Sequence, residues 1–238
     1  MEKAIIKTFN GKTPRWGDGC YFSENATLVG DCSLGDDCSV WFNAVLRADI
    51  NSIRLGDRCN VQDGACLHVA HGDGAVVIGN DVSIGHNATV HACTIHDGAL
   101  IGMGSTVLDG AVVGEGAIVA AGAVVLQHTV IGSNEIWGGV PAKFIKRAAP
   151  GQALAYAQSY VEVKEKYLEL AGHDKGSSQS SDGGSVCTPP CSWTRVVGRA
   201  FSHILWEDDG SPHSQGGARR GIRIIYADCN TSVPAPHS

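Results

Sequence analysis

An aliphatic residue returns at every sixth position along a stretch that runs from residue 101 to residue 131. Glycine follows several of these aliphatic residues, as in the segment IGMGSTVLDGAVVGEG. Self-similarity of this kind is typical of a parallel β-helix, because each hexapeptide forms one short strand and one corner. Three hexapeptides then make a triangular coil, and successive coils stack about 4.8 Å apart. The repeat therefore predicts an all-β solenoid. The repeating positions are Ile101, Val107, Val113, Val119, Val125 and Ile131.

The same phase continues upstream and allows the three edges of each coil to be numbered. Leu55, Val61 and Leu67 lie on edges one, two and three of one coil. The spacing is interrupted after residue 46 and after residue 67, and each interruption predicts a loop that leaves a corner. The other aliphatic positions are Phe22, Leu28, Leu34, Val40 and Leu46 in the earlier coils, and Ile78, Ile84 and Val90 in the coil that follows.

The composition agrees with a repetitive fold that is filled by small aliphatic residues. Of 238 residues, 31 are glycine and only 6% are aromatic. The net charge of −6 gives no basic footprint for nucleic acid. No apolar stretch of about 18 residues predicts a membrane span, and the N-terminus does not resemble a signal peptide. We therefore expect a cytoplasmic protein with no membrane or nucleic-acid partner.

Four of the nine cysteines occupy one repeating slot, two residues before an aliphatic position. That slot favours a small side chain, and a free cysteine packs as a small hydrophobic residue. This placement predicts reduced packing residues and not a disulfide framework. The four are Cys32, Cys38, Cys59 and Cys93.

Two histidines fall in one outward-facing column of the predicted solenoid. His68 follows Leu67 and His91 follows Val90, so both are outward residues on edge three of consecutive coils. Stacked residues lie about one strand spacing apart, and two imidazoles at that distance can share one metal ion. Arg47 occupies the same column one coil earlier. The column therefore predicts a candidate metal site.

A third histidine, His86, lies on edge two and does not fit that column. Five extended residues separate it from His91, a span of roughly 16 Å, which is too far for one ion in one chain. Either another subunit supplies the partners of His86, or His86 is not a ligand. A trimer in which edge two faces edge three of the next subunit would bring all three histidines together. Three histidines and an open position are the pattern of catalytic zinc.

Several segments carry a resemblance to a known family. These are VLRAD, DRCNVQDGACLHV, IGNDVSIGHNATVHACTI, IGMGSTVLDGAVVGEGAIVAAGAVV and WGGVPAKFIK. Together they resemble the gamma-class carbonic anhydrases over about residues 10–170. The resemblance implies a left-handed parallel β-helix that forms a homotrimer with metal at the subunit interfaces. It also implies hydration of CO2 to bicarbonate through a metal-bound hydroxide.

The resemblance assigns roles to particular residues. It implies that His68, His86 and His91 bind the metal, which is zinc with Fe²⁺ or Co²⁺ as alternatives, because three imidazoles suit all of them. It implies that Gln62 lies by the metal-bound solvent. Four further site residues follow from it: Arg47 and Asp63 as an inter-subunit ion pair, with Asp49 and Asn60 nearby.

The sequence departs from the best-known members of that family in one loop. Those members carry a long acidic loop that passes protons to solvent, whereas the loop between Leu67 and Ile78 is short here. Its titratable groups are His71 and Asp73. We therefore expect proton release to depend on an external buffer or on His71.

Two other functions stay open. The chain is alternatively an acyl-coenzyme A transferase or thioesterase, because fold does not determine function. Its phosphate-binding cations would be Arg54, Arg58, Lys143 and Lys146, which are sparse. The third hypothesis is a non-catalytic trimer that serves as an assembly part, since the acidic loop is missing.

The predicted domain of residues 1–150 is followed by two segments of different character. Residues 151–171 have helical periodicity and predict a C-terminal helix that packs back along the coils and caps them. Residues 172–238 begin with the linker-like segment GHDKGSSQSSDGGS, and we expect this tail to be disordered. A zinc site built on Cys187 and Cys191 is disfavoured, because their spacing is not a standard one.

Overall fold

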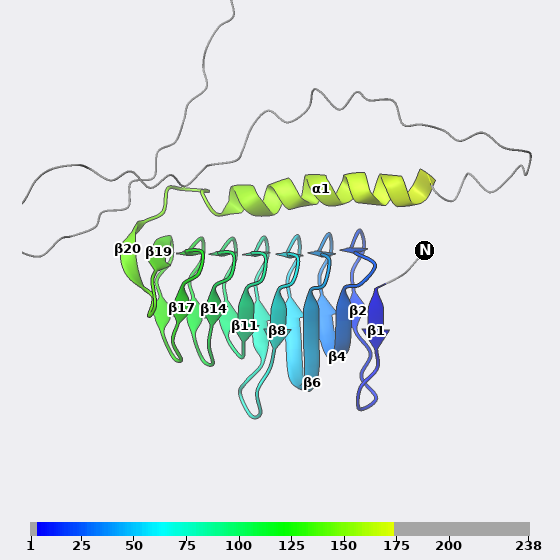
Figure 1. Ribbon diagram of the computed structural model, residues 1–238, viewed down its shortest axis with the longest axis horizontal. Coiled ribbons are helices and arrows are strands. Elements are labelled where there is room, and N and C mark those ends of the chain that lie inside the picture. Colours follow the sequence, from blue (N-terminus) through cyan, green and yellow to red (C-terminus); the bar gives the residue numbers. More distant parts are fainter. Residues whose placement is uncertain (1–3, 174–238) are drawn as a thin grey trace, which may run out of the picture. The chain divides into compact units, whose positions relative to one another are not determined.

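A computed structural model describes residues 4–173 as a parallel β-solenoid followed by one α-helix (Figure 1). This confirms the predicted fold class. The elements are β1 (Ile5–Lys7), β2 (Arg15–Trp16), β3 (Tyr21–Phe22), β4 (Thr27–Leu34), β5 (Ser39–Val40), β6 (Val45–Leu55), β7 (Asn60–Val61), β8 (Cys66–His68), β9 (Val76–Ile78), β10 (Ser83–Ile84), β11 (Thr89–His91), β12 (Thr94–Ile95), β13 (Leu100–Ile101), β14 (Thr106–Val107), β15 (Val112–Val113), β16 (Ile118–Val119), β17 (Val124–Val125), β18 (Val130–Ile131), β19 (Glu135–Gly138), β20 (Lys143–Arg147) and α1 (Leu154–His173).

The strand register agrees with the edges numbered from the sequence. Leu55 pairs with Ile78, Val61 with Ile84 and Leu67 with Val90, each between successive coils. Edge two forms an eight-stranded sheet that runs from β3 to β20, whereas edges one and three belong to a twelve-stranded sheet. The hexapeptide phase therefore predicted which residues are stacked neighbours.

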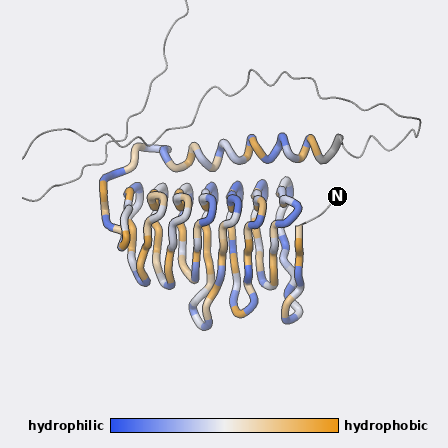
Figure 2. Tube along the Cα trace, viewed as in Figure 1, coloured by the Kyte–Doolittle hydropathy of each residue, from blue (hydrophilic) through white to orange (hydrophobic). Residues whose placement is uncertain are grey.

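The inward aliphatic residues of successive coils form the core. Leu46, Leu67 and Val90 are fully buried, as are Val61 and Ile84 on edge two. Apolar and polar positions alternate through the coils (Figure 2). At Gly85 a Cβ atom would lie 2.7 Å from the backbone nitrogen of Met103, so this tight stacking excludes a larger residue beside His86.

Removing a core side chain is expected to destabilise the solenoid strongly. Leu67 is fully buried, and Leu67→Ala should lower the free energy of unfolding by about 2–5 kcal/mol, because a cavity remains in the stack. Denaturant unfolding at a fixed protein concentration measures this loss. Leu170→Ala is the matched control: Leu170 is 65% exposed, so its replacement should change stability by less than about 0.5 kcal/mol. Equal losses for the two variants would contradict the packing described.

The two interruptions of the repeat take different forms. The first is a continuous strand, β6, whose start pairs with β8 and whose end pairs with β9, so it passes from one edge to the next without a separate loop. Its partner β4 accommodates this with a register shift between Gly30 and Cys32. The second is the predicted loop, which spans residues 69–75 between β8 and β9 (Figure 1).

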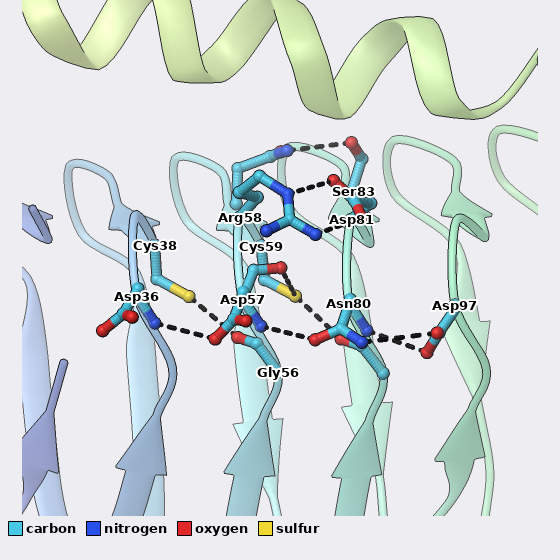
Figure 3. Close-up of polar contacts among 12 residues, drawn as sticks. Asp36, Cys38, Gly56, Asp57, Arg58, Cys59, Asn80, Asp81, Ser83 and Asp97 are labelled. Carbon is cyan, nitrogen blue, oxygen red and sulfur yellow. Dashed lines mark hydrogen bonds and ion pairs between the residues drawn. The ribbon is translucent and has the colours of Figure 1, made fainter. Parts of the chain in front are cut away.

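Polar side chains join successive coils along one corner of the solenoid (Figure 3). Backbone N–H groups of Asp36, Asp57 and Asn80 each donate a 2.9 Å hydrogen bond to the side-chain oxygen one coil later. The accepting oxygens belong to Asp57, Asn80 and Asp97. Carboxylates at this corner therefore stabilise the stacking of successive coils.

The helix α1 runs back along the coils and covers the eight-stranded sheet (Figure 1). Tyr160 and Tyr167 pack against the Trp41 ring with centroids 5.5 and 5.1 Å away. The fully buried Lys164 donates to Asp37 (2.9 Å) and to the neighbouring Glu165. Burial lowers the pKa of Lys164, but these hydrogen bonds outweigh it and hold the pKa above its usual range.

The ends of the helix differ from the predicted range of 151–171. Gly151 adopts a φ of 71°, so the chain turns there and α1 begins only at residue 154. The backbone N–H of Ala149 donates to the Gln152 side chain across this turn. The helix continues to residue 173, two residues into the predicted linker. The rest of the predicted tail, 174–238, with Cys187 and Cys191, lies outside the described residues.

At the end of the stack, β19 pairs in parallel with β16 and antiparallel with β20. All six cysteines in the described part of the chain are free, including the four at the predicted packing slot, which are buried. In residues 4–173 the one helix lacks an apolar stretch that would cross a bilayer.

Candidate metal centre

His68 and His91 form a stacked pair on neighbouring strands. They end β8 and β11, and the register places them directly opposite each other, with Arg47 of β6 next in the column. The Nδ1 atom of His68 lies 3.1 Å from Nε2 of His91, and the ring centroids are 5.1 Å apart. The column predicted from the hexapeptide phase is therefore present.

The spacing of these two nitrogens suits a shared ion. Two imidazole ligands at about 2.0–2.1 Å from a tetrahedral ion lie about 3.3 Å apart, close to the 3.1 Å between the pair. Burial lowers the pKa of His68, and the hydrogen bond with Asp49 opposes this effect only in part. Burial thus favours the neutral imidazole that a metal ion requires.

Each histidine of the pair also contacts a carboxylate on its other side. Nε2 of His68 lies 3.2 Å from Oδ1 of Asp49, and Nδ1 of His91 lies 2.5 Å from Oδ1 of Asp109. Arg47 donates to the second oxygen of Asp49. Burial raises the pKa of Asp49, but the hydrogen bonds from Arg47 and His68 outweigh it and hold the pKa below its usual range.

The third histidine, His86, is partly exposed beside helix α1 and has its own partners. Nδ1 of His86 lies 2.7 Å from Asp63, and its Nε2 lies 3.3 Å from the Tyr160 hydroxyl. Burial raises the pKa of Tyr160 to about 12, so this hydroxyl stays protonated beside the imidazole. Within residues 4–173 of one chain, no three His, Cys, Asp or Glu side chains converge on a position for a metal ion. Residues 4–173 of one chain therefore bring the pair together without a third converging side chain.

Gln62 and Asn60 form a fixed amide chain next to His86. The Gln62 amide donates to Asn60 (2.9 Å), and its oxygen accepts the backbone N–H of His86 (3.2 Å). Asn60 donates in turn to the Ser83 hydroxyl at 2.8 Å. Gln62 follows Val61 outward as expected, yet it is only 4% exposed, on the sheet that α1 covers. Its side chain is thus held in one orientation.

The expected pair of Arg47 and Asp63 does not form within one chain. Arg47 pairs with Asp49, and Asp63 pairs with His86. The inter-subunit pairing of Arg47 and Asp63 stays a prediction, since it requires a second copy of the chain.

Two contacts at the site were missed from the sequence. Asp109 comes two residues after Val107, the aliphatic residue that stacks on Val90, so the repeat carried a signal for its position near His91. Tyr160 lies 74 residues from His86 and carried no signal, because the repeat does not specify how the helix packs.

Comparisons with known proteins place the chain among the hexapeptide-repeat proteins. A family model described as bacterial transferase hexapeptide (six repeats) matches residues 92–127. The chain is 31% identical to a carbonic anhydrase of Geobacillus kaustophilus, over 74% of this chain and 93% of that protein. It is 40% identical to gamma carbonic anhydrase 2, mitochondrial, of Arabidopsis thaliana, over 71% and 61% of the two chains.

The chain belongs to the gamma-class carbonic anhydrase family. It spans about three fifths of the length of the plant relatives that it matches. Among solved structures, the fold is shared with a Bacillus cereus protein provisionally assigned as an acetyltransferase. That structure superimposes with a TM-score of 0.68 and 36% identity, over 71% of this chain and 99% of the other.

Proposed function

We propose that the chain hydrates CO2 to bicarbonate as a homotrimer with a divalent metal ion bound between subunits. The observation that carries this proposal is the His68–His91 pair, whose ring nitrogens face each other at 3.1 Å while carboxylates hold the opposite sides of both rings. Membership of the gamma-class family supports the same activity.

Zinc is the proposed ion, with Fe²⁺ and Co²⁺ as alternatives that accept the same imidazole ligands. His68 and His91 of one subunit would hold it together with His86 of the next, because within residues 4–173 of one chain only the first two converge. When bound, such an ion supplies Lewis acidity that lowers the pKa of water towards about 7.

Gln62 is proposed to orient the substrate. Its amide nitrogen carries two N–H groups, and one is already donated to Asn60. The other remains for an oxygen of CO2 or bicarbonate. The bond from the His86 backbone to the Gln62 oxygen prevents the amide from flipping, so a donor and not an acceptor faces the substrate.

Arg47 and Asp63 are proposed to act at the subunit interface and not on the substrate. Arg47 is half-exposed beside Asp49, and Asp63 is 43% exposed beside His86. Both charged groups are therefore accessible to a second copy of the chain. An ion pair between them would fix the register of the trimer.

The test of this function measures metal content and CO2 hydration on the same anaerobically purified full-length protein. We expect about one metal ion per chain and hydration that a chelator removes and zinc, iron or cobalt restores. Stopped-flow measurement of proton release gives the rate. Metal-loaded trimer without hydration would overturn the proposal.

An acyl-coenzyme A transferase is the second candidate, favoured by the match to the Bacillus cereus structure. Two of its expected phosphate-binding cations are already engaged. Arg54 donates to Asp31, and Arg58 makes two hydrogen bonds to Asp81 at 2.7 and 2.8 Å. Lys143 and Lys146 lie on the exposed strand β20. Turnover of acyl-coenzyme A thioesters by protein that does not hydrate CO2 would favour this candidate or a thioesterase, and inactivity in both assays would favour the assembly role.

A further inference from the structure

Asp109 contacts His91 from the coil that follows it. Asp109 lies between β14 and β15, and its Oδ1 is 2.5 Å from Nδ1 of His91. Stacking holds its backbone on both sides. The backbone N–H of Gly110 donates to the Ala92 carbonyl at 2.8 Å, and the N–H of His128 donates to the Asp109 carbonyl at 2.9 Å. The carboxylate is thus presented to the imidazole by a rigid corner.

The contact determines which nitrogen of His91 is available. An ionised carboxylate only accepts hydrogen bonds, so Nδ1 of His91 carries the hydrogen and donates to Asp109. In a neutral imidazole the other nitrogen, Nε2, then has a free lone pair. That atom faces His68 at 3.1 Å. The carboxylate therefore selects the tautomer in which His91 can bind an ion on the side of its partner.

Asp109 differs from the aspartates that join successive coils along one corner of the solenoid. The carboxylates of Asp57 and Asp97 accept backbone N–H groups of the preceding coil (Figure 3). The carboxylate of Asp109 accepts from an imidazole instead. An aspartate that only accepts backbone N–H groups at a corner would not need its carboxylate directed at an imidazole.

We propose that Asp109 is a positioning residue that orients His91 and fixes its tautomer for metal binding. This inference rests on the proposed function, because it concerns the same site. Carboxylate partners of metal-binding histidines commonly have this effect, and their loss weakens metal binding by about 10–100-fold.

Asp109→Asn tests the proposal with two measurements on the full-length protein. The first is ¹⁵N–¹H NMR of histidine-labelled, metal-free protein at about pH 8, where most imidazoles are neutral. Wild type should show His91 with hydrogen on Nδ1, and Asp109→Asn should show a mixture of both tautomers. The second is competition with a chelator for Zn²⁺, in which Asp109→Asn should bind about 10–100-fold more weakly. Asp109→Glu should recover part of the affinity, because it restores the carboxylate.

Glu115→Gln is the matched control, since Glu115 is exposed and its replacement also removes one negative charge. It should change neither measurement. Light scattering and thermal unfolding show whether each variant keeps the assembly and stability of wild type. An unchanged tautomer and Zn²⁺ affinity in folded Asp109→Asn would overturn the inference. Wild type that binds no Zn²⁺ while its tautomer still depends on Asp109 would instead refute the proposed function. If Asp109→Asn does not fold, the same two measurements are made on Asp109→Glu. Loss of the wild-type His91 tautomer in folded Asp109→Glu would then overturn the inference.

Discussion

Mixed trimers of His86→Ala and His68→Ala chains are expected to recover metal binding that neither variant shows alone. In His86→Ala every interface lacks the third ligand, and in His68→Ala every interface has a broken pair. In a mixed trimer, the intact pair of a His86→Ala chain can meet the intact His86 of a His68→Ala chain. Random assembly from equal amounts would restore about a quarter of the interfaces. Metal analysis after joint unfolding and refolding measures this fraction.

The structure gives a reason to expect this complementation. His68 and His91 converge in one chain, whereas His86 is engaged with Asp63 and Tyr160. His96→Ala is the control, because His96 is exposed and follows edge one, away from the pair. It should retain full metal content and give no gain on mixing. A stable wild-type monomer with a full equivalent of metal would refute an interfacial site.

The stacked pair could be predicted because a solenoid converts sequence phase directly into spatial position. Once Leu67 and Val90 were assigned to the same edge, the residues after them had to stack, and the register of His68 against His91 confirms this. The five extra residues of the intervening loop did not disturb the prediction, since a loop that leaves a corner returns the chain to the same phase.

The environment of the site could not be predicted in the same way. A hexapeptide phase specifies strand neighbours but not the direction of side chains at corners, so the contact of Asp109 with His91 was missed. It also says nothing about the register of a helix on the outer face. Gln62 follows Val61 outward, yet it is almost fully buried. Helix packing depends on aromatic contacts such as Trp41 with Tyr160, which carry no repeat.

The first interruption of the repeat shows the same limit. A loss of phase after residue 46 indicates extra residues but not their conformation. In the structure these residues extend β6 between two partner strands instead of forming a separate loop. Asn51 on this strand donates hydrogen bonds to the carbonyls of Ala70 (3.0 Å) and Gly72 (2.8 Å). The extended part of β6 therefore supports the loop of residues 69–75, which carries His71.

Proton release is expected to limit CO2 hydration, so the rate at saturating CO2 should rise with added imidazole buffer. The loop of residues 69–75 offers His71 and Asp73 as its titratable groups, and both are exposed. An external buffer can then replace the missing acidic relay. Stopped-flow measurements across a series of imidazole concentrations, at constant ionic strength, give the dependence. A high rate that does not depend on buffer would show that an internal relay exists.

Two variants separate proton release from the attack on CO2. His71→Ala should lower the buffer-free rate by about tenfold or less, and saturating imidazole should restore it, because His71 would act only as a proton carrier. Gln62→Ala should lower kcat/KM, by about 10²-fold if its amide stabilises the transition state, and imidazole should not restore it. The amide chain from Ser83 through Asn60 to Gln62 explains the difference, since it holds a donor in place that no soluble buffer can replace. Rescue of Gln62→Ala by imidazole would assign Gln62 to proton transfer instead of substrate orientation.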